Sequence, residues 1–327
     1  MIGICQFGAG RIGAIHAANV AASGARLVYV VDVDAEAAAR LAARHGARVA
    51  DADTALADPS VAAVIIASST DTHADLIERA ARAGKTIFCE KPVDLSLARA
   101  DRCVAAVAAT GMRVLMGFNR RFDPSFAALK RRIGAGAIGT VEMVQITSRD
   151  PRPPPVAYVR VSGGLFRDMM IHDFDMARFI LGEEPVEVSA AASCLVDPAI
   201  GAVGDVDSAL VTLRTASGRL CQISNSRRAA YGYDQRVEVL GSGGMLEAGN
   251  PRPTTVVSST AAGVSADTPY DFFLERYADA YRAELAHFMD VCGGRAEPLV
   301  GIEDGRQALA LAEAAIESAR SGRAVRV

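Results

Sequence analysis

The sequence lacks long apolar runs, basic clusters and paired cysteine motifs, and each absence argues against a class of protein. No apolar stretch reaches the ~18–20 residues that a transmembrane helix needs, and the first ten residues lack the charged and apolar regions of a secretory signal. Charge is nearly balanced, with 35 Lys and Arg against 38 Asp and Glu. No basic or aromatic cluster is present to bind phosphate backbones. We therefore expect a cytoplasmic protein that binds neither membranes nor nucleic acid.

The cysteines and the chain length exclude further classes of protein. Six cysteines stand singly in apolar segments, without CxxC or metal-finger spacing, and we expect them to be reduced core residues. The chain has 327 residues, of which 50% are hydrophobic. A typical domain has ~100–200 residues, so two domains with separate cores are expected. A disordered or fibrous protein is excluded.

Up to about Gly117, β-branched runs alternate with alanine-rich segments whose apolar residues recur at helical spacing. This alternation is typical of a doubly wound parallel sheet covered by helices, and it predicts an α/β domain. The predicted strands are 2–7, 26–32, 61–67, 86–89 and 113–117, and the predicted helices are 11–22, 35–45, 73–83 and 96–109.

After residues 118–122 the pattern changes to short strands with little helix between them. They predict one large open antiparallel sheet in an α+β domain, with the GSGG of 241–244 as a hairpin turn. The predicted strands are 140–148, 186–196, 207–215, 219–226, 234–240 and 254–258, and the predicted helices are 122–133, 168–181, 272–291 and 303–321. We place the first domain at 1–120 and the second at 121–327, with the last two helices free to pack on the first.

A glycine-rich loop between the first predicted strand and helix indicates a dinucleotide-binding site. Gly8 permits a tight turn, Gly10 lets the backbone approach a pyrophosphate, and Gly13 lets helix and strand pack closely. The loop residues Arg11 and Ile12 complete the GxGxxG pattern in the strand–loop–helix context that gives it meaning. A glycine-rich turn without a ligand is the alternative. We expect a Rossmann fold here.

Asp32 ends the second predicted strand, ~20 residues after the glycines, where an acid binds the ribose hydroxyls of NAD. A carboxylate there repels the 2′-phosphate of NADP. Val33 and Asp34 follow, without an arginine to neutralise that phosphate, so NAD is the predicted cofactor. Asp34 is better placed than Asp32 to cap the next helix.

Two further strand ends carry polar residues at the sheet edge where α/β proteins bind ligands. Ser69, Thr70 and His73 follow the third strand, where hydroxyls and amides could line the dinucleotide. Thr72 or Asp71 could also cap the next helix, and both roles can hold at once. Glu90 and Lys91 follow the fourth strand. A lysine there is solvated more often than catalytic.

Asp168, His172 and Asp175 are spaced i, i+4 and i+7, which places them on one face of the predicted helix 168–181. Three interpretations compete: a metal site, which lacks a second histidine or a cysteine, a buried structural network, and acid–base catalysis. We favour catalysis, because an imidazole exchanges protons near neutral pH and a carboxylate can orient it. We interpret the other histidines outside the cofactor crevice as surface or packing residues; these are His16, His45 and His287.

These motifs together resemble the glucose–fructose oxidoreductase/inositol dehydrogenase/MocA family. The resemblance rests on the glycine loop, on Glu-Lys-Pro at 90–92 and on Gly-Gly at 163–164 leading into Asp168-Met-Met-Ile-His172, and it covers nearly the whole chain. Within the family, the segments 117–124, 148–151 and 163–179 most resemble myo-inositol 2-dehydrogenases.

The resemblance implies roles for individual residues and an assembly. It makes Lys91, Asp168 and His172 the catalytic set and places Thr70, His73 and Glu90 beside the cofactor. The polyol pocket is implied to contain Arg121, Asp150 and Asp175, with Tyr231 as a weaker candidate. The outer face of the second sheet is a subunit interface in this family, so a homotetramer is implied.

The expected reaction is NAD-dependent oxidation of myo-inositol to 2-keto-myo-inositol in inositol catabolism, without a metal. Three candidate carboxylates against Lys91 and Arg121 favour a neutral polyol over an acidic substrate. The alternatives are a dehydrogenase of scyllo-inositol, glucose or another cyclic polyol, and a regulator that senses the dinucleotide without catalysis.

Overall fold

The computed structural model describes all 327 residues and divides them into two units. The first unit contains residues 1–122 and 280–309, and the second contains 123–279 and 310–327. The helices predicted near the end of the chain therefore divide between the units. None of the helices combines the length and apolar character needed to cross a membrane.

The first unit is built on a six-stranded parallel sheet in the order β3-β2-β1-β4-β5-β6. Its strands are β1 (Gly3–Phe7), β2 (Arg26–Val31), β3 (Arg48–Val49), β4 (Ala63–Ile66), β5 (Thr86–Glu90) and β6 (Val114–Gly117). The central strands are buried on both faces, which explains their nearly continuous apolar sequence. The predicted doubly wound sheet is confirmed; the short β3 is an addition that the sequence pattern did not reveal.

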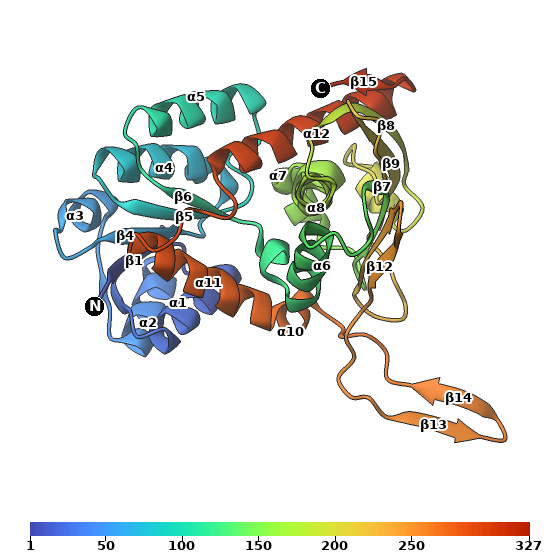
Figure 1. The fold of residues 1–327 in the computed structure, drawn as a ribbon. Coiled ribbons are helices and arrows are strands. Elements are labelled where there is room, and N and C mark those ends of the chain that lie inside the picture. Colours follow the sequence, from blue (N-terminus) through green and yellow to red (C-terminus); the bar gives the residue numbers. More distant parts are fainter. The chain divides into compact units, whose positions relative to one another are not determined.

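Helices cover both faces of this sheet. In Figure 1, α4 and α5 lie on one face, and α1, α2 and the part of α11 in this unit lie on the other. The helical segments are α1 (Arg11–Ala22), α2 (Ala35–His45), α3 (Ala52–Ala57), η1 (Thr70–Thr72), α4 (His73–Arg82), α5 (Leu97–Ala108), η2 (Asn119–Phe122), α11 (Ala278–Cys292) and the start of α12 (Ile302–Ser321). Asp34 caps α2 by accepting hydrogen bonds from the Glu36 and Ala37 amides, as predicted.

The second unit contains a seven-stranded sheet in the order β12-β11-β7-β10-β9-β8-β15. Its strands are β7 (Val141–Arg149), β8 (Pro185–Ser193), β9 (Ser208–Thr215), β10 (Leu220–Ser226), β11 (Asp234–Gly241), β12 (Gly244–Ala248) and β15 (Val325–Arg326). The large open sheet is confirmed, and so is the hairpin turn between β11 and β12. The prediction of a purely antiparallel sheet is wrong, because β7 and β10 pair in parallel.

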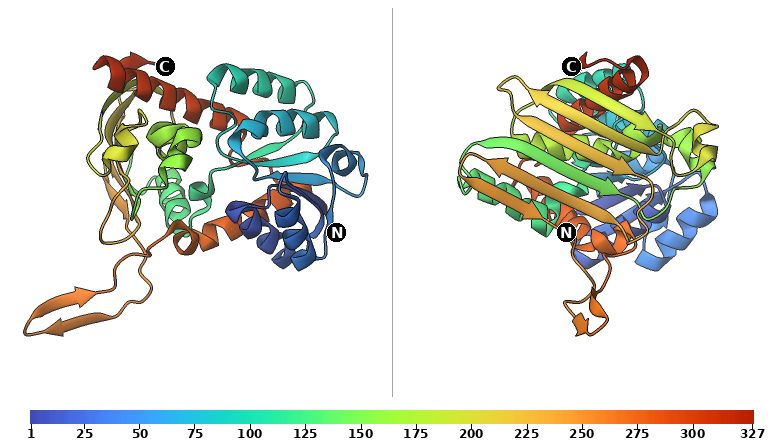
Figure 2. Two further views of the ribbon diagram at one scale, coloured as in Figure 1. Left: turned by 180° about the vertical axis from the view of Figure 1, so that it is seen from behind. Right: turned by 90° about the vertical axis from the view of Figure 1, so that its right-hand side faces the viewer.

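Helices of the second unit cover one face of its sheet and leave the other bare. In the right-hand view of Figure 2 the bare face points at the viewer. The helical segments are α6 (Pro124–Gly134), α7 (Val156–Ser162), η3 (Leu165–Met169), α8 (Ile171–Leu181), α9 (Pro198–Gly201), α10 (Phe273–Arg276) and the end of α12. The predicted single helix 272–291 is divided into α10 and α11.

A β-hairpin formed by β13 (Val257–Thr260) and β14 (Gly263–Ala266) projects from the second unit (Figures 1 and 2). The two strands pair only with each other, and all their residues are exposed. The prediction that 254–258 forms part of the large sheet is therefore wrong.

The cysteines are free, as expected, but not all of them belong to a core. Cys194 is exposed and Cys292 is half-buried. Burial raises the pKa of Cys103 to about 12, which keeps this thiol protonated and unreactive near neutral pH.

Candidate functional site

The glycine loop of the first unit has the geometry of a dinucleotide cradle. Gly8 has a φ of +100°, and a Cβ there would lie 2.3 Å from the Ala67 carbonyl oxygen. A Cβ on Gly13 would lie 2.2 Å from the Gly8 carbonyl oxygen, whereas a Cβ on Gly10 would meet nothing within 4 Å. The protein's own packing therefore requires Gly8 and Gly13. The open space at Gly10 fits a ligand that approaches the backbone.

The start of α1 is suited to an anion. No side chain caps this helix, and no acidic residue lies in its first turn. Its amides can therefore bind a pyrophosphate. Arg11, which follows Gly10, is exposed, and Ile12 is half-buried.

Asp32 is fixed by backbone amides at the end of β2. Its two carboxylate oxygens accept hydrogen bonds from the amides of Ala9 at 2.6 Å and Asp34 at 2.8 Å. These bonds connect the carboxylate to the glycine loop, which is where a ribose-binding acid is needed. Val33 beside it is fully exposed.

The segment after β4 forms a hydroxyl-rich turn. Ser68 and Thr72 share a hydrogen bond of 2.7 Å, and the Thr72 hydroxyl also donates to the Ser69 carbonyl oxygen. Thr72 occupies the N-cap position of α4, as predicted, but its side chain makes no capping hydrogen bond. Ser69 and Thr70 lie at this turn and are available to a ligand at the sheet edge.

His73 lies beneath this turn instead of on its surface. It is almost fully buried, and its ring nitrogens lie 2.8 Å from the Pro92 carbonyl oxygen and 3.2 Å from that of Ser68. Burial lowers the pKa of His73, which favours the neutral ring. His73 thus joins the Ser68 turn to the segment that carries Lys91. Its predicted place beside the cofactor stays a prediction.

Glu90 ends β5, Lys91 follows it, and a histidine on α1 contacts Glu90. The Glu90 carboxylate lies 2.7 Å from the Nε2 atom of His16, which is fully buried on α1 and packs edge-on against Phe88. The interpretation of His16 as a surface or packing residue missed this polar contact. Lys91, the next residue, is half-buried.

Sequence analysis also missed Glu284 on α11. Its side chain is fully buried, and neither carboxyl oxygen has a hydrogen-bond partner. Burial, followed by repulsion from Glu90, raises the pKa of Glu284 well above 4.5. A signal was present in the sequence: Tyr281, Leu285 and Phe288 place Glu284 on the apolar stripe of its helix.

Arg121 lies on η2 and is buried in the first unit. Its guanidinium donates to the Asp304 carboxylate and to the Leu299 carbonyl oxygen, both at 3.0 Å. Part of its hydrogen-bonding capacity therefore serves the fold of its own unit. The predicted role in the polyol pocket stays a prediction.

In the second unit, the predicted helix 168–181 begins later than expected. Asp168 belongs to the π-helical segment η3, and α8 starts at Ile171. Residues 165–169 wind more widely than an α-helix, because the Met170 amide donates to the Leu165 carbonyl oxygen five residues back. The strict i, i+4, i+7 face therefore does not extend back to Asp168.

The members of the predicted polar stripe differ in environment. The Tyr158 hydroxyl donates to the Asp168 carboxylate at 2.9 Å, and the Arg227 guanidinium lies 3.8 Å from it. His172 is half-buried in the first turn of α8. Asp175 is fully buried on the same helix, and its carboxylate lies 3.7 Å from Arg178. Asp168 and His172 are thus more exposed than Asp175.

The remaining two candidates lie where β7 ends and before β11 begins. Asp150 follows β7 and is half-buried, and its amide donates to the Ser226 carbonyl oxygen at 2.9 Å. The Tyr231 hydroxyl donates to Asp234 at 2.7 Å and accepts from Arg149 at 3.1 Å. Tyr231 therefore already has two polar partners within its own unit.

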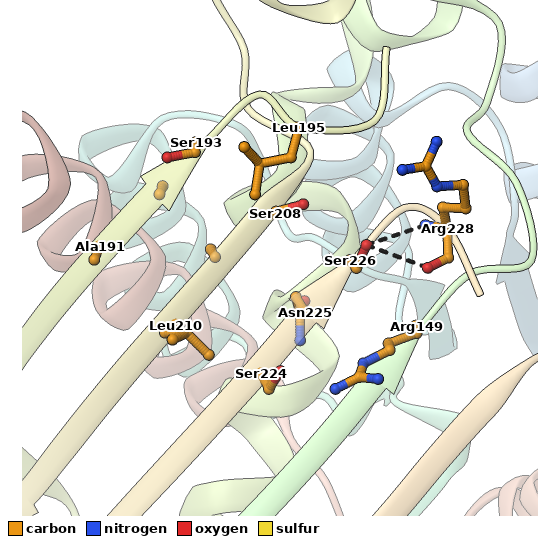
Figure 3. A pocket seen from close by; sticks show the side chains of 12 residues that line it. Arg149, Ala191, Ser193, Leu195, Ser208, Leu210, Ser224, Asn225, Ser226 and Arg228 are labelled. Atoms are coloured by element: carbon orange, nitrogen blue, oxygen red, sulfur yellow. Dashed lines mark hydrogen bonds between the residues drawn. The ribbon is translucent and has the colours of Figure 1, made fainter.

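A hollow on the sheet of the second unit coincides with none of these residues. Serines from β8, β9 and β10 line it, with Arg149 and Arg228 at one end (Figure 3). No group of three or more His, Cys, Asp or Glu side chains is arranged to hold a metal ion.

Comparison with known proteins identifies the family. Residues 2–118 match the model described as "Oxidoreductase family, NAD-binding Rossmann fold", and residues 130–327 match "Oxidoreductase family, C-terminal alpha/beta domain". The chain is 52% identical to the inositol 2-dehydrogenase of Rhizobium meliloti (strain 1021), over 98% of this chain and 97% of that protein.

Solved structures agree with this assignment. The crystal structure of a myo-inositol dehydrogenase from Corynebacterium glutamicum is 45% identical, with a TM-score of 0.96 over 100% of this chain and 99% of that one. A scyllo-inositol dehydrogenase from Lactobacillus casei, solved with bound NAD(H) and scyllo-inositol, is 28% identical, with a TM-score of 0.92 over 100% and 99% of the two chains. With its NAD-binding Rossmann domain, this chain belongs to the glucose–fructose oxidoreductase/inositol dehydrogenase/MocA family of oxidoreductases.

Proposed function

We propose that this protein is an NAD-dependent inositol 2-dehydrogenase that oxidises myo-inositol to 2-keto-myo-inositol in inositol catabolism. The observation that carries the proposal is the similarity to an inositol 2-dehydrogenase at 52% identity over nearly the whole chain. The presence of Lys91, Asp168 and His172, the catalytic set that the family resemblance implies, supports it. Because the reaction draws on the intracellular NAD pool, we place the protein in the cytoplasm.

We assign cofactor binding to the first unit and substrate binding mainly to the second. The amide groups at the start of α1 would hold the pyrophosphate of NAD over Gly10, and Asp32 would accept hydrogen bonds from the ribose hydroxyls. Asp32 also accounts for a preference for NAD, since its charge repels a 2′-phosphate. When bound, NAD⁺ supplies the hydride acceptor of the reaction.

The chain's own residues supply the proton chemistry. His172 takes the proton of the reacting hydroxyl, because an imidazole accepts protons near neutral pH. The Lys91 ammonium stabilises the negative charge that develops on the oxygen by charge and hydrogen bonding. Asp168 orients one of these two groups. The Tyr158 hydroxyl in turn donates a hydrogen bond to the Asp168 carboxylate.

The charge of the proposed pocket favours a neutral substrate with many hydroxyls. Asp150, Asp168 and Asp175 offer carboxylate acceptors to hydroxyl groups and repel acidic substrates. A site built on such bonds rejects analogues that lack a hydroxyl, because its polar groups are then left unpaired. We keep Arg121 and Tyr231 in this pocket, and each also forms a hydrogen bond with a residue of its own unit.

We also propose that the protein is a homotetramer. An apolar row crosses the bare sheet face, in which Met143 pairs with both Leu220 and Leu240, and Leu240 pairs with Met245. These side chains are 39% to 51% exposed in a single chain. A continuous apolar row on one face is typical of a protein interface. The projecting β13–β14 hairpin supports the same proposal, since an isolated two-stranded hairpin is marginally stable in water.

An NADH-formation assay tests the activity directly. Purified protein is mixed with NAD⁺ and myo-inositol, scyllo-inositol or glucose, and absorbance at the NADH band is followed. We expect the highest kcat/KM with myo-inositol, and the His172→Ala variant is the matched blank. A higher kcat/KM with scyllo-inositol or glucose would identify that compound as the substrate. NAD binding without NADH formation from any polyol would favour the dinucleotide-sensing regulator.

A further inference from the structure

Arg227 is a buried cation that the proposed function does not use. It follows β10 directly, its amide donates to the Asp207 carbonyl oxygen at 2.8 Å, and its side chain is 2% exposed. Its Nε and Nη2 atoms are buried without any hydrogen-bond partner. A guanidinium is costly to bury unless it is paired, so unengaged donors in such a place call for a function.

The unengaged donors form the edge with which other arginines of this unit grip carboxylates. Arg178 donates through Nε and Nη2 to the two oxygens of Glu184 at 2.7 and 2.6 Å. Arg214 holds Glu187 through the same two atoms at 3.1 and 2.9 Å. This two-point geometry fixes the plane of a carboxylate as well as its charge. In Arg227 the same two atoms, Nε and Nη2, have no hydrogen-bond partner.

The nearest carboxylate to this edge is Asp168. The Nη2 atom of Arg227 lies 3.8 Å from Oδ2 of Asp168, while Oδ1 accepts the 2.9 Å hydrogen bond from Tyr158. Each carboxylate oxygen therefore faces a different donor. A movement of about 1 Å would bring the Arg227 pair to the ~2.8 Å of a charge-assisted hydrogen bond.

We propose that Arg227 is the positioning residue of Asp168. Its cationic edge and the Tyr158 hydroxyl hold the Asp168 carboxylate from two sides and set the direction in which it points. The inference rests on the role of Asp168 in the proposed function and adds a residue that the sequence motifs do not contain.

A double-mutant cycle tests the proposal with purified full-length enzyme. Arg227→Gln removes the charge with little change in length, and we expect kcat with myo-inositol to fall on the order of 10²-fold, the loss typical of a misplaced catalytic group. The KM for NAD⁺ should stay unchanged. In an Asp168→Asn background, the same substitution should cost no further activity, because Arg227 acts through Asp168. Equal losses in both backgrounds, or wild-type kcat in the single variant, would overturn the proposal.

Conservative and control variants separate positioning from simple structural support. Arg227→Lys keeps the charge without the two-point edge, so kcat should lie between those of the wild type and Arg227→Gln. Arg214→Gln removes the same chemical group from an exposed ion pair and should leave kcat unchanged. If Arg227→Gln does not fold, the cycle is run with Arg227→Lys, and additive losses in that cycle would count equally against the proposal.

A second readout does not depend on the proposed reaction. Thermal unfolding midpoints of the wild type, the two single variants and the double variant give the coupling between Arg227 and Asp168. We expect the double variant to unfold at a higher temperature than the sum of the two single shifts predicts, since each single variant leaves one charge unpaired. Additive shifts would overturn the pairing. Failure of the proposed function would instead appear as absence of NADH with the wild type.

Discussion

Replacing Glu284 by Gln should make the stability of this protein less dependent on pH. Glu284 is fully buried on α11, and neither of its carboxyl oxygens has a hydrogen-bond partner. Burial, and then the charge of Glu90, raises its pKa well above 4.5. His16, which contacts Glu90, is the other titratable group identified in this cluster. The folded protein therefore keeps the Glu284 proton at pH values where the unfolded chain has released it.

The size of the effect follows from proton linkage. When folding raises the pKa of a group, its contribution to stability is complete below the unfolded value and is lost as pH rises towards the folded value. Within that window, Glu284 costs the wild type about 1.4 kcal/mol of unfolding free energy per pH unit. Glutamine has no such proton. Above the unfolded value, the stability difference should therefore move in favour of Glu284→Gln by up to ~1.4 kcal/mol for each pH unit until the folded value is reached.

The assay is denaturant unfolding of both proteins at three pH values within this range. A buried amide without partners costs ~1–3 kcal/mol, but it does so at every pH, so the diagnostic quantity is the change with pH and not the offset. Glu36→Gln on α2, at a glutamate whose side chain is 89% exposed, is the matched control and should run parallel to the wild type. Parallel curves for Glu284→Gln as well would refute the reasoning, because they would mean that Glu284 is ionised in the folded protein.

Three further predictions test the proposed function. Asp32→Ala should raise the ratio of kcat/KM with NADP to that with NAD, because it removes the charge that repels a 2′-phosphate; an unchanged ratio in steady-state assays would contradict the assignment. His172→Ala should lower kcat with myo-inositol by about 10²–10⁴-fold, and near wild-type turnover would reassign the base. Met143→Lys should dissociate the tetramer in sedimentation velocity, since it places a charge in the centre of the apolar row, whereas Glu36→Lys should not. If the wild-type protein itself sediments as a monomer, the proposed tetramer is wrong.

Local patterns were sufficient to predict most strands and helices in the first 117 residues. Strand β1, the glycine loop and α1 are consecutive in sequence, so their apolar periodicity and the glycine spacing already contain the geometry that the structure shows. Asp34 could likewise be identified as a cap from its position before an alanine-rich helix. The short β3 could not, because only two residues pair and both are exposed.

Pairing between distant strands was not predictable from the second half of the chain. Alternation identifies β7 and β10 as half-buried strands, but it does not contain the direction in which they pair, and they are parallel. For the same reason the pattern around residue 257 indicated a strand without showing that its partner is β14. The start of α8 was misplaced because the apolar pattern does not reveal the π-helical turn at residues 165–169.

The same limit explains which parts of the candidate site were found. Residues within a motif could be predicted from the sequence, whereas their hydrogen-bond partners could not. The Ala9 amide contacts Asp32, and the His16 side chain contacts Glu90. Such supports contribute through geometry, because a carboxylate held from two sides loses fewer orientations when it binds its target. The precision of this site therefore depends on residues that carry no signature of their own. Substitution of His16, whose side chain makes the contact, should reduce activity without abolishing it.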